Sequence, residues 1–168
     1  AAGAYSLMKP ELPWALLIAA LCIQLRLLCN LLDGMVAVEG RRGTPTGPLW
    51  TEVPDRVTDT FFLVAAGYGI GWTDLGWTCA LLAVLTAYVR LLGGTLGMAQ
   101  DFGGPQAKPQ RMALLTLACL LGAIESWRLP GSVLVLQTAL LLIAAGTLWT
   151  LVRRTRKIAA ALQANSRS

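Results

Sequence analysis

Polar side chains with helical spacing stand out at the ends of two apolar segments in this chain of 168 residues. Arg26, Asn30 and Asp33 are separated by four and then three residues, so they share one face of a helix. Asp55 and Asp59 are one turn apart and share a second face. If the two faces meet, their carboxylate and amide oxygens favour a hard divalent cation, Mg²⁺ or Mn²⁺. The spacing therefore predicts a metal site between two helices.

A plainer interpretation of the same acidic residues is structural. Asp55 could cap the first turn of a helix and pair with Arg56 or Arg26, because acidic residues are common in first turns. Thr51 lies one turn before Asp55 and would add a hydroxyl oxygen to the metal site if the helix begins early enough. Spacing within each segment leaves both interpretations open.

Apolar segments must position these residues. Of the 168 residues 55% are hydrophobic and only 14% are charged, which is too little polar surface for an ordinary soluble domain. Segments of about 20 apolar residues can cross a bilayer as helices. The sequence predicts an all-α membrane helical bundle, a single domain over 1–168, with five spans at about 13–38, 56–72, 76–96, 112–127 and 132–152.

Basic residues set the predicted orientation. Arg41 and Arg42 lie in the first loop, Lys108 and Arg111 in or beside the third, and a basic tail occupies 153–168. The positive-inside rule places these segments and the polar site on the cytoplasmic side. Five spans then leave the N-terminus outside with no basic segment to start insertion. We therefore expect a sixth span upstream of the first residue.

Composition also excludes several kinds of chemistry. The chain has no histidine, which excludes histidine-ligated metals and Ser-His or Cys-His nucleophiles. Its four cysteines lie in apolar stretches without CxxC spacing, so a zinc site or redox pair is not expected. The net charge of +5 is spread between apolar spans, which favours contact with membrane lipid and not with nucleic acid.

The order of residues around the predicted metal site resembles a known motif. From residue 30 the chain reads Asn-Leu-Leu-Asp-Gly-Met-Val-Ala, followed by Gly47 and Asp55. This is similar to the signature D-x2-D-G-x2-A-R-x8-G-x3-D-x3-D of the CDP-alcohol phosphatidyltransferase family. Asp33, Gly34 and Ala37 fall on family positions without gaps, and the motif covers about 26 residues.

Three positions depart from the family pattern. Asn30 and Thr51 replace aspartates, and Val38 replaces the arginine. Arg41 or Arg42 could stand in for that arginine. A displacement of the site by one turn would make Asp55 and Asp59 its paired acids, and the additional carboxylates available are those of Glu39 and Glu52.

The resemblance implies transfer of a phosphatidyl group from CDP-diacylglycerol, or a similar CDP-lipid, to an alcohol or alcohol phosphate, with release of CMP in phospholipid synthesis. Asp55 or Asp59 would be the catalytic base. The implied metal ligands are Asn30, Asp33, Thr51, Asp55 and Asp59, and the implied nucleotide-binding residues are Gly34, Ala37, Gly47 and Arg41.

Three basic residues later in the sequence are candidates for binding the acceptor. Arg90, Lys108 and Arg111 could hold an anionic phosphate on the alcohol. The resemblance also suggests a homodimer, and the lack of organelle signals suggests a bacterial inner membrane. Two other functions remain open, namely a catalytically inactive, lipid-binding subunit of the same fold and a small carrier that uses its intramembrane charges as an ion pathway.

Overall fold

The computed structural model describes residues 1–39, 46–99, 101 and 103–165, and over these residues the protein is entirely helical. It contains a short α1 (Ala2–Leu7) and five long helices, α2 (Pro13–Glu39), α3 (Gly47–Gly69), α4 (Thr73–Thr95), α5 (Lys108–Arg128) and α6 (Leu134–Asn165). No strand occurs in the described ranges. The predicted all-α class is confirmed.

The five long helices coincide with the five predicted spans but differ at their ends. α3 begins at Gly47, well before the predicted residue 56, because a proline in its first turn suits a helix start. It ends at Gly69, just before Gly71 takes the positive φ of 74° that a side chain would disfavour. α6 continues through the basic tail to Asn165, since that tail contains no glycine or proline.

Three helices are long and apolar enough to cross a membrane. They cover Pro13–Leu32 within α2, all of α4, and Leu134–Ala164 within α6. α3 and α5 differ from them because α3 carries several charged residues in its first half and α5 carries charged residues at both ends. The membrane character is therefore supported by three helices, and the assignment of five spans stays a prediction.

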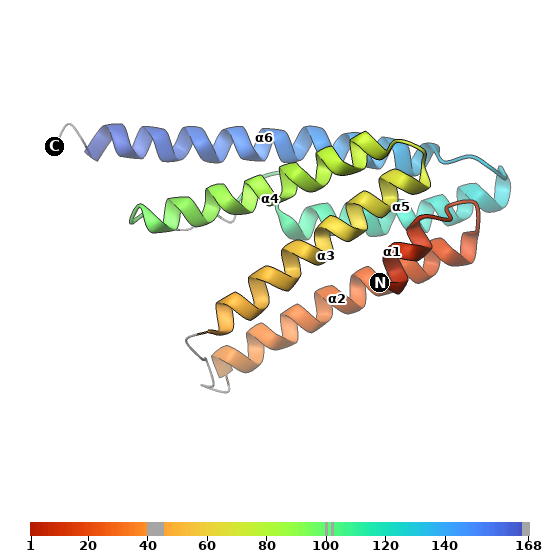
Figure 1. Ribbon diagram of the computed structural model, residues 1–168, viewed down its shortest axis with the longest axis horizontal. Helices are drawn as coiled ribbons and strands as arrows, with labels where there is room; N and C mark the ends of the chain where they lie inside the picture. Colours follow the sequence, from red (N-terminus) through yellow and green to blue (C-terminus); the bar gives the residue numbers. More distant parts are fainter. Residues whose placement is uncertain (40–45, 100, 102, 166–168) are drawn as a thin grey trace.

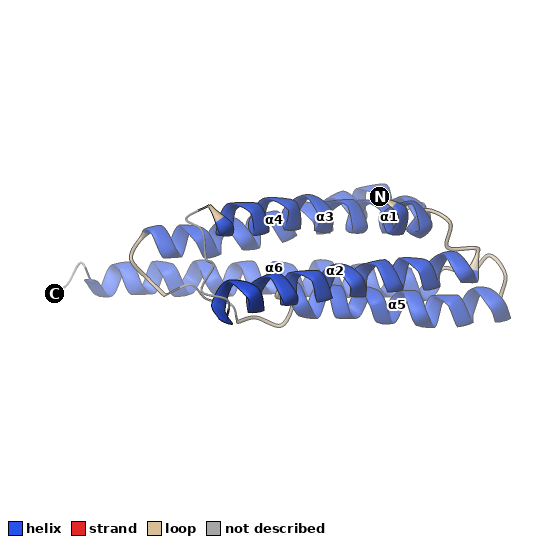
Figure 2. Cartoon of the chain, turned by 90° about the horizontal axis from the view of Figure 1, so that it is seen from below, coloured by secondary structure: helices blue, strands red, loops and turns tan. Residues whose placement is uncertain are grey.

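Consecutive long helices run in opposite directions, so the end of one helix and the start of the next lie at the same end of the bundle (Figure 1). The C-terminal ends of α2, α4 and α6 lie toward the end where α3 and α5 begin. In the view from below, α1, α3 and α4 occupy one layer and α2 and α5 another (Figure 2). α6 packs against both α4 and α5. This alternation brings five separate chain segments toward one end of the bundle.

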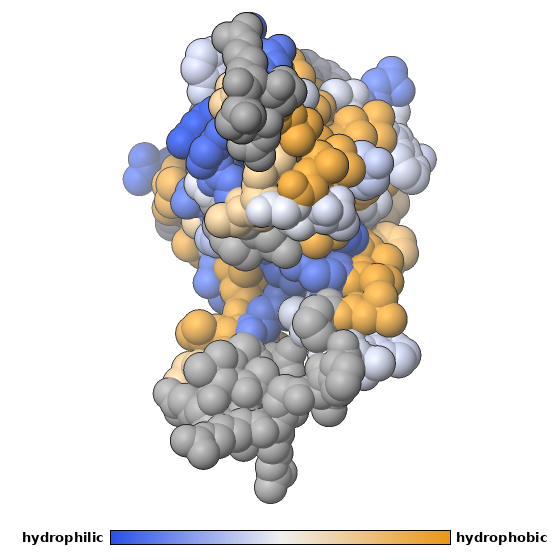
Figure 3. Space-filling view, turned by 90° about the vertical axis from the view of Figure 1, so that its left-hand side faces the viewer, coloured by the Kyte–Doolittle hydropathy of each residue, from blue (hydrophilic) through white to orange (hydrophobic). Residues whose placement is uncertain are grey.

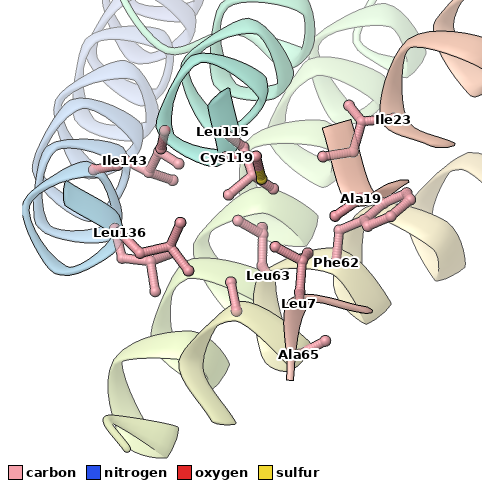
Figure 4. Close-up of a cluster of buried hydrophobic side chains, with 14 of the residues drawn as sticks. Leu7, Ala19, Ile23, Phe62, Leu63, Ala65, Leu115, Cys119, Leu136 and Ile143 are labelled. Atoms are coloured by element: carbon pink, nitrogen blue, oxygen red, sulfur yellow. The ribbon is translucent and has the colours of Figure 1, made fainter. Parts of the chain in front are cut away.

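The core lies near the other end of the bundle and is built from apolar side chains of all six helices. Leu7 of α1 is fully buried and packs in one cluster with Phe62 and Leu63 of α3 (Figure 4). Leu115 and Leu136 extend the cluster to α5 and α6. Burial of this kind holds the helices in the register that the polar end of the bundle requires.

Large apolar side chains also cover the outside of the bundle. Leu21, Leu81, Trp127 and Leu142 are each more than half exposed, at 59%, 60%, 77% and 59%. Exposed leucine and tryptophan over several helices would be costly in water and are favourable against lipid. The outer surface therefore agrees with a bilayer environment.

Two glycines set how closely α3 and α4 approach. A Cβ atom at Gly67 would lie 2.6 Å from the Gly76 Cα atom, which belongs to the backbone and cannot move aside. We expect Gly67→Ala to destabilise the protein by about 1–3 kcal/mol, because an inserted methyl group forces the two helices apart. Thermal unfolding in detergent measures this effect. Leu81→Ala, on the exposed face of α4, is the control and should leave the unfolding temperature nearly unchanged.

Candidate functional site

Asp55 is the centre of a polar cluster at the end where α3 and α5 begin. Its Oδ1 accepts hydrogen bonds from Arg26 Nη2 at 2.8 Å and from Asn30 Nδ2 at 2.6 Å. Its Oδ2 pairs with the Lys108 ammonium, and its backbone carbonyl accepts a second bond from Arg26. Three helices, α2, α3 and α5, therefore meet at one aspartate that is only 5% exposed.

Asp59 lies one turn further along α3 and is more deeply buried, at 1% exposed. Its Oδ1 is 2.6 Å from Arg26 Nη1, and its Oδ2 is 3.4 Å from Arg111 Nη2. Arg26 thus bridges both aspartates, one through each terminal nitrogen. The shared helical face predicted for Asp55 and Asp59 is confirmed by this common partner. The pairing with Arg26 is also the plainer interpretation of these acids.

Glu52 lies on α3 about one turn before Asp55 and extends the cluster toward α4. Its two oxygens pair with Arg56 at 3.0 Å and with Arg90 at 2.6 Å. Glu52 is only partly buried, so each pair alone contributes little stability. Its effect is to place the Arg90 guanidinium beside the same region that Lys108 reaches from α5.

A cavity of about 350 Å³ lies among these groups. We call it the polar cavity; the side chains that line it include Asn30, Thr51, Glu52, Asp55, Arg56, Thr86, Arg90, Lys108, Arg111 and Arg154. Its volume is within the range of small-molecule sites. Seen end-on, hydrophilic side chains gather on this face of the molecule between hydrophobic ones (Figure 3). The cavity is therefore a polar recess in an otherwise apolar bundle.

The predicted site residues converge on this cavity from distant parts of the chain. Arg90, Lys108 and Arg111, the predicted acceptor-binding cations, line it together with Asn30 and Asp55. Thr51 also lines it, and its hydroxyl donates to the Gly47 carbonyl at 3.2 Å. Asp59 is not among the lining residues, since it lies one turn beyond Asp55 against Arg111.

Several predicted site residues lie partly or wholly outside the part of the chain that the structure describes. Asp33, Gly34, Ala37 and Glu39 belong to α2, but the structure describes only their place in the helix and not their surroundings. Arg41 and Arg42 fall entirely outside the described ranges. Gly47 is the first residue of α3. The nucleotide-binding role predicted for Gly34, Ala37, Gly47 and Arg41 therefore stays a prediction.

Arg154 lines the polar cavity, although its place in the sequence predicted only a basic tail. It is 6% exposed, and its Nη1 donates to the Thr86 carbonyl at 3.0 Å. Its Nε and Nη2 donate to the Gly103 carbonyl, each at 3.2 Å. Thr147, Thr150 and Arg154 recur at helical spacing and are all buried. That polar stripe on an apolar helix was the signal that could have identified Arg154.

Positive charge exceeds negative charge around the polar cavity. Among described residues in or directly beside it, the acidic side chains are Glu52, Asp55 and Asp59. The cationic side chains are Arg26, Arg56, Arg90, Lys108, Arg111 and Arg154. Of these cations Arg111 and Arg154 are buried, and buried charges are weakly screened by solvent. The arrangement is suited to an anion with more than one negative charge.

A divalent metal is not accommodated by the described donors alone. No group of three or more His, Cys, Asp or Glu side chains that could hold a metal ion occurs in the described part of the chain. The carboxylates of Asp55 and Asp59 are already neutralised by Arg26, Lys108 and Arg111, and Asn30 presents its amide nitrogen to Asp55. An ion bound there would have to displace these cations. Mg²⁺ or Mn²⁺ therefore stays a prediction from the sequence.

A separate ion pair lies further toward the end of the bundle. Lys157 Nζ is 2.9 Å from Asp101 Oδ2, and the Gly103 amide donates to Asp101 Oδ1 at 2.8 Å. The hydrogen bond from Lys157 lowers the pKa of the Asp101 carboxyl below its ordinary value, and the Gly103 amide acts in the same direction. Asp101 therefore stays ionised and ties the segment before α5 to α6.

Comparison with known proteins gives one similarity over most of the chain. No protein-family model matches the sequence. The chain is 27% identical over 156 residues to inner membrane protein YnbA of Escherichia coli (strain K12), an alignment that covers 90% of this chain and 74% of that protein. With its three long apolar helices, the chain is a helical membrane protein.

Proposed function

We propose that this protein transfers a phosphatidyl group from CDP-diacylglycerol, or a similar CDP-linked lipid, to an alcohol and releases CMP. The observation that carries the proposal is the polar cavity, where Asp55 lies with Arg90, Lys108 and Arg111 from two other helices. The motif that resembles the CDP-alcohol phosphatidyltransferases supplies the first of these residues. The sequence alone predicts that the three cations bind the acceptor, and that prediction does not depend on their lying close to Asp55.

The excess of positive charge supports a diphosphate as the bound group. A CDP-lipid brings two adjacent phosphates, and Arg56, Arg90 and Lys108 line one cavity from three helices. Guanidinium groups bind phosphate oxygens in pairs, whereas the lysine ammonium acts as a compact charge. The described residues can therefore neutralise the diphosphate and stabilise CMP as it leaves.

The transfer itself requires little covalent chemistry from the protein. The hydroxyl oxygen of the acceptor attacks the phosphorus on the lipid side of the diphosphate, and the bond from that phosphorus to the CMP oxygen breaks. Asp55 lines the cavity and takes the hydroxyl proton. When a phosphate draws Lys108 away, Asp55 loses a cationic partner and accepts a proton more readily.

The membrane placement is part of the same proposal. The polar cavity lies at the end of the bundle that carries four basic residues, Arg153, Arg154, Arg156 and Lys157, and the positive-inside rule puts that end in the cytoplasm. The similarity to an inner membrane protein supports a bacterial inner membrane. α3 and α5 would complete five spans, with their charged ends at the interface.

The paired state of the aspartates favours a second candidate, a catalytically inactive subunit that binds lipid headgroups. Arg26 holds Asp55 and Asp59 together, and Lys108 and Arg111 occupy the remaining oxygens. A network in which each acid has two cationic partners is stable without a reaction. An anionic headgroup could still contact Arg56 and Arg90, which share the Glu52 carboxylate and line the cavity.

CMP release separates the two candidates. The purified protein in lipid nanodiscs receives CDP-diacylglycerol and a panel of alcohols and alcohol phosphates, with EDTA, Mg²⁺ or Mn²⁺. Transfer predicts CMP in proportion to the new phospholipid, and activity only with added metal would support the predicted cofactor. Binding of CDP-diacylglycerol without CMP from any acceptor would contradict the transferase and support the inactive subunit.

A further inference from the structure

A second cavity of about 220 Å³ lies between the C-terminal parts of α4 and α6. We call it the α4–α6 cavity. Its walls are mainly apolar and include Val89, Gly93, Met98, Ile158 and Ala161. Gly93 lies close to α6, since a Cβ atom there would be 3.1 Å from the Ile158 Cδ1 atom. This cavity has no role in the transfer as described above.

The α4–α6 cavity adjoins the polar cavity. Arg90 and Arg154 line both of them, so the two recesses share a cationic wall. A molecule could therefore place an anionic group between these arginines and an apolar group on the α4–α6 side. The position suits a small amphipathic ligand better than a purely polar one.

Arg154 has the donors that such a ligand requires. A guanidinium carries five N–H donors. The hydrogen bonds to the described residues Thr86 and Gly103 use three of them, and both acceptors are neutral carbonyls. Asp101 lines the same cavity but forms its ion pair with Lys157, and no described carboxylate forms one with Arg154. A bound anion would therefore give Arg154 a direct ionic partner that the described carboxylates do not provide.

The volume limits the size of the apolar group. A group the size of water takes up about 30 Å³, so 220 Å³ accommodates roughly seven such groups. Two acyl chains of a phospholipid donor are far larger. A short aliphatic or ring-shaped body fits, which points to the acceptor and not to the lipid tails.

We propose that the α4–α6 cavity binds the apolar body of the acceptor, and that the acceptor is an amphipathic alcohol whose anionic group lies between Arg90 and Arg154. Only the assignment of the ligand as the acceptor rests on the proposed transfer. The binding site itself stands on the geometry of the two cavities, so the two can be tested separately.

Hexyl phosphate and inorganic phosphate are the probes for binding. Both are titrated by calorimetry into the protein in nanodiscs of neutral lipid, with empty nanodiscs subtracted for partitioning. We expect hexyl phosphate to bind at least about tenfold more tightly than inorganic phosphate, because its chain leaves water for the apolar walls. Equal affinities would overturn the proposal.

Ala161→Phe fills the cavity and is the decisive variant. It should remove the preference for hexyl phosphate and leave the affinity for inorganic phosphate unchanged. Ala160→Phe adds the same ring on the exposed face of α6, outside the lining, and should retain the full preference. An unchanged preference in Ala161→Phe would overturn the proposal. If that variant does not fold, Ile158→Thr should reduce the preference by placing a hydroxyl in the apolar wall.

The activity assay links the site to the reaction. Among acceptors with the same hydroxyl and phosphate, those with a short apolar group should have a higher kcat/KM than those without one. Ala161→Phe should abolish this difference between acceptors. CMP release with equal kcat/KM for both kinds of acceptor would overturn the acceptor assignment while the transferase stands. Absence of CMP with every acceptor would contradict the transferase, and the hexyl phosphate titration would still decide the binding site.

Discussion

Replacement of Asp55 by asparagine is expected to lower CMP release by about a hundredfold or more, the usual contribution of a general base. The amide is the same size but takes no proton from the acceptor hydroxyl. It also removes the negative charge that holds Arg26 and Lys108. Steady-state kinetics with CDP-diacylglycerol should show the loss mainly in kcat, because the cationic side chains that bind the phosphates remain.

Two matched variants make this expectation specific. Asp59→Asn should lower stability more than turnover, because Asp59 does not line the polar cavity and is 1% exposed against Arg26 and Arg111. Asp74→Asn, in the first turn of α4 at the opposite end of the bundle, should change neither. If Asp59→Asn abolished turnover and Asp55→Asn did not, the base would be Asp59 and the site would be displaced by one turn.

Arg111→Met is expected to reduce the free energy of unfolding by about 3 kcal/mol, the effect of removing one partner from a buried ion pair. Arg111 is 1% exposed and its guanidinium lies 3.4 Å from the Asp59 carboxylate, which is equally buried. Methionine fills the space but leaves Asp59 with Arg26 as its remaining described partner. Unfolding in detergent, followed by circular dichroism, measures the change.

A double variant tests whether charge is the reason. Asp59→Asn combined with Arg111→Met removes both charges, so it should be more stable than Arg111→Met alone. Arg128→Met, at the exposed end of the same helix, is the control for replacing an arginine and should have little effect. A double variant less stable than both single variants would show that the ion pair is not what Arg111 contributes.

The sequence alone was sufficient for the properties that depend on neighbouring residues. The five apolar segments became α2 to α6 because helix formation and burial are decided by runs of about 20 residues. The pairs Arg26 with Asn30 and Asp55 with Asp59 share helical faces because the helix repeats about every 3.6 residues. Helix ends were less well predicted, since the start at Gly47 and the continuation of α6 depend on turn geometry and on packing.

Only the tertiary structure decided which of these faces meet. Arg26 lies between two aspartates, Lys108 reaches Asp55 across 53 positions of the chain, and Arg154 lies on the wall between two cavities. Such contacts depend on how each helix is rotated and how far it slides against its neighbours. Those quantities are fixed by core packing, as where Gly67 lets α4 approach α3, and spacing within one segment contains no information about them.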